Sequence, residues 1–247
     1  VGPGASVDGG SLQAGASSAI NNEGTLNGAN ISVGSGSRVS NAANAPGSIT
    51  GNINFAAAGA SQTNILENFR GLAPATITGD IVSAGGAFLV TNDGTITGNL
   101  TSAGVTTINN TGSITGTTVS VGGGSTINNL ASGPGSITAD IAFGDAGTTL
   151  TNTLNNLGAS TITGNVSSAG GAFNLTNAGT LTGNISSSGN TTIGNTGSIT
   201  GDILLGGVAD FFSMHAFGFY WYVFNIADMA IVAGVVGLLY DSLRGES

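Results

Sequence analysis

Thr95-Ile-Thr-Gly-Asn-Leu100 is the phrase that decides the fold, because close copies of it recur through the first 203 residues. Its first three positions alternate polar and apolar residues, mostly β-branched, which is typical of a short strand with one buried face. The Gly-Asn or Gly-Asp that follows supplies a turn. Further copies begin at Thr25, Ser48, Thr76, Ser113, Ser136, Thr161, Thr180 and Ser198.

These copies form a regular repeat. From Gly79 onward the fourth position of the phrase returns every 18 to 25 residues, and residues 76–115 return with few changes at an offset of 85 residues, as in solenoids. One repeat cannot bury its own isoleucine, whereas repeats stacked about 4.8 Å apart share a narrow continuous core. We therefore predict an all-β fold for residues 1–203, a parallel β-helix (β-solenoid) of about nine rungs with about three short strands in each.

The second position of the phrase is apolar, and alternate residues of a strand face opposite ways. This position therefore predicts a column of side chains that point into the core, one from each rung, which we call the inward ladder. The predicted ladder contains Ile49, Ile77, Ile96, Ile114, Ile137, Ile162, Leu181 and Ile199. A second corner, such as Asn92-Asp-Gly94, precedes most copies, and stacking in register would place asparagine on asparagine. The sequence thus predicts columns of like residues along a rod.

Charge and composition exclude several classes of function. Lys and Arg number 3 against 12 Asp and Glu, and the formal charge of -9 repels nucleic-acid phosphates. The chain has no Cys, and its repeat has neither Lys nor His, so a polygalacturonase-like site is not expected, while an acid/base pair of aspartates stays open. Asp80, Asp140, Asp145 and Asp202 are interpreted as solvated corners and not as calcium ligands. We expect no cofactor and no metal.

The repeat resembles the passenger domains of bacterial autotransporters and related surface adhesins, whose units read N-x-G-[ST]-I-T-G-[DN]-I. The resemblance covers residues 20–203. It implies an elongated right-handed parallel β-helix at the cell exterior, with a structural or adhesive role and a ligand that the sequence does not specify. Uncapped strand edges at the rung ends would also favour end-to-end self-association.

Composition changes at Leu204, and residues 204–247 form a second segment that holds the only Trp and all three Tyr. Tyr222 to Tyr240 is apolar except for Asn225 and Asp228, so we predict one transmembrane α-helix over about residues 222–240 that contacts membrane lipid. The aromatic flank at residues 217–222 is typical of a membrane interface, and Arg244 would place the repeat outside. The alternative is a buried helix that caps the last rung.

Two motifs of this segment, Gly207-Val-Ala-Asp210-Phe211 and Val223-Phe-Asn225-Ile-Ala-Asp228, resemble the last two motifs of lipoprotein signal peptidase (signal peptidase II). The resemblance covers residues 204–243 and implies a membrane aspartic endopeptidase. It makes Asp210 and Asp228 the catalytic pair and Asn225 a supporting residue. Two carboxylates that share a proton can activate water and protonate the scissile group. We expect His215, between the motifs, in an exposed or interfacial loop.

Three interpretations of the whole chain follow. The first is a structural or adhesive solenoid at the cell surface, or on the periplasmic side of a bacterial membrane, anchored by the signal-peptidase-like helix. The second is a fused or fragmentary lipoprotein signal peptidase, which we expect to be inactive as this chain alone because one helix cannot hold Asp210 and Asp228 together. The third is a chimera of two unrelated sequences.

Overall fold

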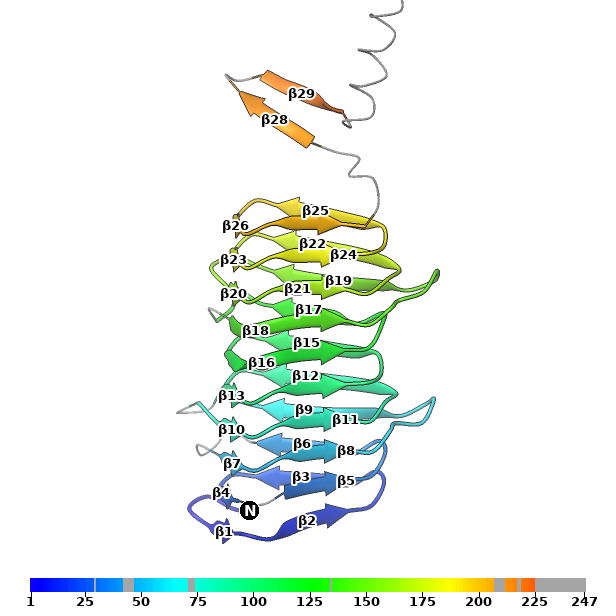
Figure 1. Ribbon diagram of the computed structural model, residues 1–247. Coiled ribbons are helices and arrows are strands. Elements are labelled where there is room, and N and C mark those ends of the chain that lie inside the picture. Colours follow the sequence, from blue (N-terminus) through cyan, green and yellow to red (C-terminus); the bar gives the residue numbers. More distant parts are fainter. Residues whose placement is uncertain are drawn as a thin grey trace, which may run out of the picture. The chain divides into compact units, whose positions relative to one another are not determined.

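The computed structural model describes residues 1–28, 30–41, 47–70, 74–133, 135–206, 212–216 and 219–224. The chain divides into two compact units, Val1–Leu204 and Leu205–Ser247. In the first unit, successive turns of the chain stack as rungs, and each complete rung contributes strands to three positions (Figure 1). The predicted parallel β-solenoid is confirmed.

The repeated phrase forms the first strand of each rung, and the next apolar residues form the second strand. The first strands are β1 (Ser6–Asp8), β4 (Thr25–Asn27), β7 (Ser48–Thr50), β10 (Thr76–Thr78), β13 (Thr95–Thr97), β16 (Ser113–Val121), β18 (Ser136–Phe143), β20 (Thr161–Thr163), β23 (Thr180–Thr182) and β26 (Ser198–Thr200). The second strands are β2 (Ser11–Ala14), β5 (Asn30–Val33), β8 (Ile53–Phe55), β11 (Ile81–Ser83), β14 (Leu100–Ser102), β21 (Val166–Ser168), β24 (Ile185–Ser187) and β27 (Ile203–Leu205). Strands β16 and β18 run through both positions.

The third strands form a separate nine-stranded sheet. They are β3 (Ala19–Asn22), β6 (Arg38–Asn41), β9 (Thr63–Asn68), β12 (Ala87–Asn92), β15 (Thr106–Asn110), β17 (Thr126–Asn129), β19 (Thr151–Asn156), β22 (Ala172–Asn177) and β25 (Thr191–Asn195). The described strand pairs of the solenoid are parallel and join equivalent positions of neighbouring rungs, as in Ile77 opposite Ile96.

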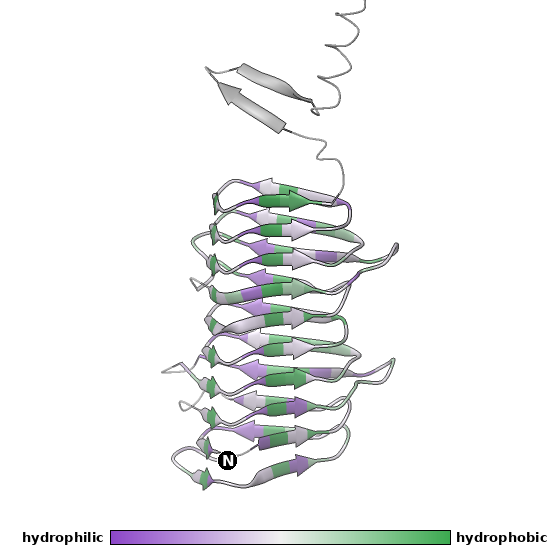
Figure 2. Ribbon diagram, in the orientation of Figure 1, coloured by the Kyte–Doolittle hydropathy of each residue, from purple (hydrophilic) through white to green (hydrophobic). Residues whose placement is uncertain are grey.

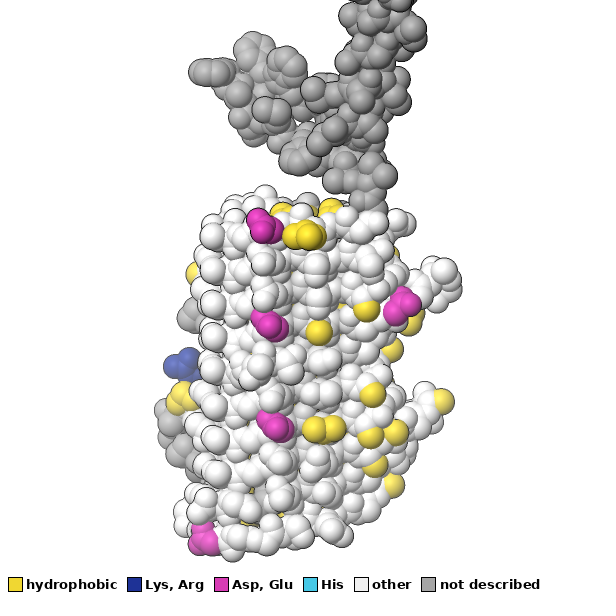
Figure 3. Space-filling model, viewed as in Figure 1, with side chains coloured by type: hydrophobic (Ala, Val, Ile, Leu, Met, Phe, Trp, Pro, Cys, Tyr) yellow, Lys and Arg dark blue, Asp and Glu magenta, His cyan; other side chains and the backbone are white. Residues whose placement is uncertain are grey.

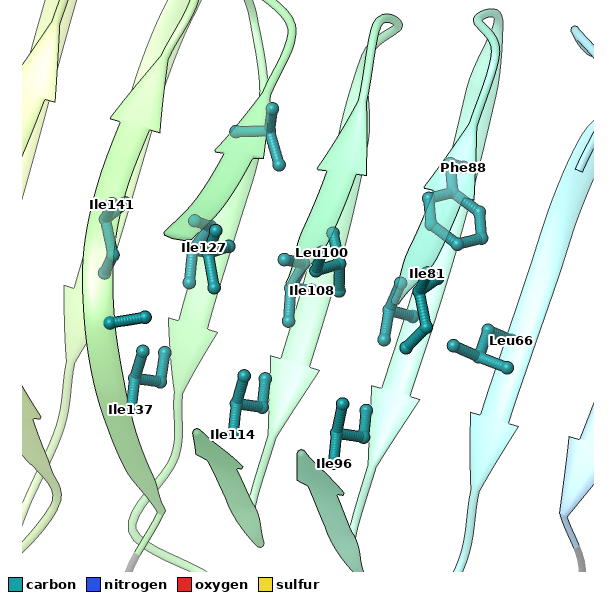
Figure 4. Packing of buried hydrophobic residues seen from close by; sticks show 14 of the residues in the cluster. Leu66, Ile81, Phe88, Ile96, Leu100, Ile108, Ile114, Ile127, Ile137 and Ile141 are labelled. Carbon is teal, nitrogen blue, oxygen red and sulfur yellow. The ribbon is translucent and has the colours of Figure 1, made fainter. Parts of the chain in front are cut away.

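The predicted isoleucine ladder is confirmed. Seven of its eight members are at most 1% exposed, and Ile199, in the last first strand, is partly buried. Apolar residues of the second and third strands meet this ladder inside the solenoid, as Figure 4 shows for Ile96, Leu100 and Ile108. Figure 2 shows the same arrangement as apolar stripes at matching places on successive rungs. The narrow core therefore extends along the stack.

A ladder of buried asparagines runs beside this core. The Nδ2 of each member donates to the Oδ1 of the next, over 2.7 to 2.9 Å. Its members are Asn22, Asn41, Asn68, Asn92, Asn110, Asn129, Asn156, Asn177 and Asn195. All but Asn195 are fully buried. Buried amides that pair with one another satisfy groups that would otherwise be costly to bury.

Strands β28 (Phe212–Ala216) and β29 (Phe219–Phe224) form an antiparallel hairpin in the second unit. Two expectations are corrected here. Residues 222–224, predicted as the start of a helix, belong to β29, and His215, predicted in a loop, belongs to β28. The aromatic residues and Val223 of β29 favour a pleated strand, and pairing with β29 places His215 in the strand β28. The remainder of the predicted helix, residues 225–240, lies outside the described residues.

Membrane-spanning helices were sought in the part of the chain that the structure describes. No helix there is long and apolar enough to cross a bilayer.

Candidate functional site

The proposed catalytic residues Asp210, Asn225 and Asp228 lie outside the described residues. The hairpin that separates their two motifs is described: Phe212 lies opposite Phe224. Asp210 precedes the first of these paired residues by two positions, and Asn225 directly follows the second. Both motifs therefore adjoin, along the chain, the open end of one hairpin.

Two aspartates of the solenoid occupy its corners and act there as hydrogen-bond acceptors. The Oδ1 of Asp80 accepts the backbone N–H of Asn99 over 2.8 Å, and the Oδ1 of Asp140 accepts that of Asn165 over 2.7 Å. Asn184 accepts the N–H of Asp202 in the same way, over 2.8 Å. Because asparagine and aspartate serve equally, the corner requires an oxygen acceptor and not a negative charge.

The spacing of these corners argues against an acid/base pair. Asp80 and Asp140 lie three rungs apart, as do Asp140 and Asp202, which is about 14 Å at the usual strand spacing. Glycosidases hold their two carboxyl groups about 5 to 9.5 Å apart. On the face shown in Figure 3 the acidic side chains are separated from one another. Across the described residues, no group of three or more His, Asp or Glu could hold a metal ion.

Asp145 differs from the other aspartates because it lies in the loop between β18 and β19. Its Oδ1 accepts the N–H of Gly147 over 2.8 Å and so braces the turn. A shallow groove beside this loop is lined by Asp145, Thr148, Ser188 and Asn190 among others. One carboxylate in an open groove provides no general acid/base pair.

Two buried asparagines that sequence reasoning missed hold the bases of the longer loops. Asn64 accepts the N–H of Gly36 over 2.9 Å and donates to the carbonyl of Ala56 over 2.7 Å. Asn152 does the same with Gly124 and Gly144, over 2.8 Å each. The signal in the sequence is the Thr-Asn dipeptide that begins both β9 and β19, directly after an insertion between the second and third strands.

The outward residues of the first strands form the most regular surface of the solenoid, which we call the threonine face. One row of this face is threonine on eight successive rungs, all exposed and in register: Thr50, Thr78, Thr97, Thr115, Thr138, Thr163, Thr182 and Thr200. The second row contains Ser48, Thr76, Thr95, Ser113, Ser136, Thr161, Thr180 and Ser198. The face therefore presents hydroxyl groups and methyl groups without a charged side chain.

The outward surface of the third strands is less uniform. It carries an ion pair between Arg38 and Glu67, whose Nε and Oε2 lie 2.7 Å apart. Further along, an outer row of asparagines joins Asn109, Asn128 and Asn155 by hydrogen bonds of 2.9 and 2.8 Å. Amides, charges and apolar residues alternate here, so this surface has no single repeating chemistry.

The chain is thus a parallel β-solenoid followed by a segment that contains a β-hairpin. That segment is similar to lipoprotein signal peptidases. The family model described as "Signal peptidase (SPase) II" matches residues 150–244. The lipoprotein signal peptidase of Methylobacterium radiotolerans is 61% identical over 41 residues, which are 17% of this chain and 24% of that protein.

Other relatives match in the same way. The lipoprotein signal peptidase of Methylorubrum extorquens is 67% identical over 39 residues, 16% of this chain and 23% of that protein. That of Rhodopseudomonas palustris is 52% identical over 56 residues, 21% of this chain and 34% of that protein. The matched segment therefore covers 23% to 34% of the length of these relatives. No solved structure matches the chain.

The match to the family model begins inside the solenoid. Residues 150–203 contain β19 to β26, whose strands continue the registers of the rungs before them. Residues 161–200 are also a near copy of residues 76–115, which the family model does not match. Resemblance to the peptidase motifs themselves is carried by the residues after 203.

Proposed function

We propose that this protein is a structural or adhesive solenoid displayed outside a bacterial cell and held at a membrane by its signal-peptidase-like C-terminal segment. The observation that carries the proposal is the unbroken asparagine ladder beside the isoleucine core. Together they make a continuous, internally bonded stack from amino acids that are mostly small and polar. A stack of this kind keeps the residues of its outer surface in a fixed register. It is also suited to presenting that surface at a distance from the point of attachment.

The surface of the solenoid supports a role in presentation rather than in turnover. Asp80 and Asp140 are engaged as corner acceptors, and the threonine face, the most regular surface of the solenoid, carries neutral hydroxyl groups. Exposed polar groups in fixed positions can contact a partner with little loss of conformational entropy.

The membrane part of the proposal rests on the C-terminal segment. Its motifs are shared with proteins named lipoprotein signal peptidase, and its sequence is apolar from Ile226 to Tyr240 apart from Asp228. A run of this composition costs little to place in a bilayer except at the aspartate. We propose that this run contacts lipid and that the solenoid lies on the outer side.

Protease treatment of intact cells that express the full chain tests the proposal. If the solenoid is displayed, added protease should remove an epitope inserted in the loop at residues 144–150 while an epitope after Ser247 stays protected until the cells are lysed. Protection of both epitopes in intact cells would contradict display. A cytoplasmic protein followed in the same cells controls for lysis.

A second candidate function is lipoprotein signal peptidase activity in the C-terminal segment. The β28–β29 hairpin favours it, because pairing of Phe212 with Phe224 makes the two aspartate motifs adjoin the same end of one hairpin. Cleavage of a lipid-modified precursor peptide, lost on substitution of Asp210 or Asp228, is the measurement that would establish this function. The chain carries about a third or less of the length of its relatives, so we expect no cleavage.

A further inference from the structure

We propose that the threonine face binds ice. The proposal concerns the solenoid alone and does not depend on how the C-terminal segment behaves. Its two rows span the first strands from β7 to β26, which stack in one column along the solenoid (Figure 1). The partner is crystalline water, a neutral solid whose surface repeats regularly in two directions.

The spacing of the face is the first argument. Within one strand the two outward residues, such as Thr95 and Thr97, are separated by about 6.6 Å, and neighbouring strands lie about 4.8 Å apart. Oxygen atoms on the prism faces of hexagonal ice repeat in two perpendicular directions at distances close to these, although not equal to them. Because the strands pair in register from Thr50 to Thr200, the spacing is kept over eight rungs without a shift in this row.

The hydroxyl groups of the face are available, which is the second argument. Within the described part of the chain, the eight threonine hydroxyls of the row from Thr50 to Thr200 have no protein hydrogen-bond partner. In the other row, Thr76 bonds to Ser48 over 3.3 Å and Ser136 to Ser113 over 3.2 Å. A free hydroxyl beside a methyl group can bond one water molecule while its methyl group occupies a gap between others.

Rigidity is the third argument, because an ordered solid is recognised best by groups that are already in place. At one end of each first strand the buried ladder holds the backbone: Asn92 donates to the carbonyl of Ser113 over 3.1 Å, and every rung from β7 to β26 has the equivalent bond. At the other end most rungs have the corner bond, as between Asp80 and Asn99. Threonine side chains are themselves stiff about χ1.

The charge distribution supports the same partner. No charged side chain occupies either row of the threonine face, although the chain carries 12 Asp and Glu and 3 Lys and Arg. On the outward surface of the third strands, Arg38 and Glu67 interrupt the pattern. A charged group keeps its own hydration shell, which does not fit an ice lattice, so the third-strand surface provides a matched control.

The experiment measures partition of the full chain into slowly grown ice, in a buffer shared by all samples and with serum albumin as a protein that ice excludes. The double variant Thr97→Lys/Thr138→Lys places two charges in the middle of the threonine face. The control Thr107→Lys/Thr176→Lys places the same charges on the outward surface of the third strands. Circular dichroism and the unfolding midpoint establish that both variants keep the fold.

We expect the full chain and the control variant to be enriched in the ice fraction, and the threonine-face variant to fall to the level of albumin. Inhibition of ice recrystallisation should follow the same order. Exclusion of the unsubstituted chain from ice would overturn the proposal, as would equal losses in the two variants. The proposal would also be overturned if the threonine-face variant entered ice like the unsubstituted chain and differed from it only in sedimentation coefficient. The face would then be a contact between copies of the chain.

Discussion

The Nδ2 of Asn92 lies 2.7 Å from the Oδ1 of Asn110, one rung further along the solenoid, and both side chains are fully buried. The same Nδ2 lies 3.1 Å from the carbonyl oxygen of Ser113. One amide thus joins two rungs through its side chain and also positions the strand that carries the threonine face. Since equivalent bonds recur along the stack, the ladder and the outer surface depend on the same residues.

Replacement of Asn110 by alanine should destabilise the solenoid strongly. The change removes the acceptor of Asn92 and the donor to Asn129, and each buried polar group left without a partner costs about 1–3 kcal/mol. Urea unfolding monitored by circular dichroism gives the free energy of unfolding. The control is Asn109→Ala, at the neighbouring outward position, where water can replace the lost bond. Equal effects of the two substitutions would contradict the role assigned to the ladder.

Gly98 should not tolerate a side chain. Its φ of +145° is a conformation that favours glycine, and a Cβ would lie 2.1 Å from the carbonyl oxygen of Gly79 on the preceding rung. Gly98→Ala should therefore lower the free energy of unfolding by at least about 1–3 kcal/mol. Gly194→Ala is the matched control, because the nearest atom to its Cβ would be the carbonyl oxygen of Leu175, 3.9 Å away. A smaller effect at Gly98 than at Gly194 would refute this account.

The corner aspartates should be replaceable by asparagine. Asp80→Asn and Asp140→Asn keep the oxygen that accepts the N–H of the next rung, so we expect the unfolding midpoint to stay the same within error. Addition of calcium should not raise that midpoint for the unsubstituted chain. A calcium-dependent increase that Asp140→Asn abolishes would mean that the carboxylates bind metal.

Removal of residues 204–247 should change how the protein behaves in solution. The Trp, the three Tyr and the longest apolar run lie in this piece, so its loss should convert a chain that requires detergent into one that does not. Partition between aqueous and detergent phases measures the difference. A full chain that stays monomeric in plain buffer would instead favour the interpretation of residues 222–240 as a cap.

The purified full chain should leave a lipoprotein precursor peptide uncut. An aspartic site needs its two carboxylates close together and shielded from water, and this chain contains only about a third or less of the length of the related peptidases. Peptide cleavage followed by mass spectrometry provides the measurement. Cleavage that Asp210→Asn or Asp228→Asn abolishes would make the enzyme the correct interpretation.

The sequence predicted the parts of the fold that depend on local alternation. The inward ladder from Ile49 to Ile199 follows from the two-residue period of a strand, which holds wherever the strand pairs. The helix expected from Tyr222 was wrong for residues 222–224, because aromatic and β-branched residues suit a strand once β28 is available to pair with them. For the candidate catalytic residues, Asp210, Asn225 and Asp228, the assignment stays a prediction from motif resemblance.

By itself, the sequence determined the period of the repeat, the residues that face inward and the alternation that places threonine outside. Tertiary structure alone decided which partners many of the polar residues bond. Asn64 bonds to Gly36, 28 residues away, and Asp80 bonds to Asn99, 19 residues away. Neither bonding partner can be identified from the sequence around Asn64 or Asp80. The reason is that these bonds join different rungs, so they exist only after stacking has set the register between them.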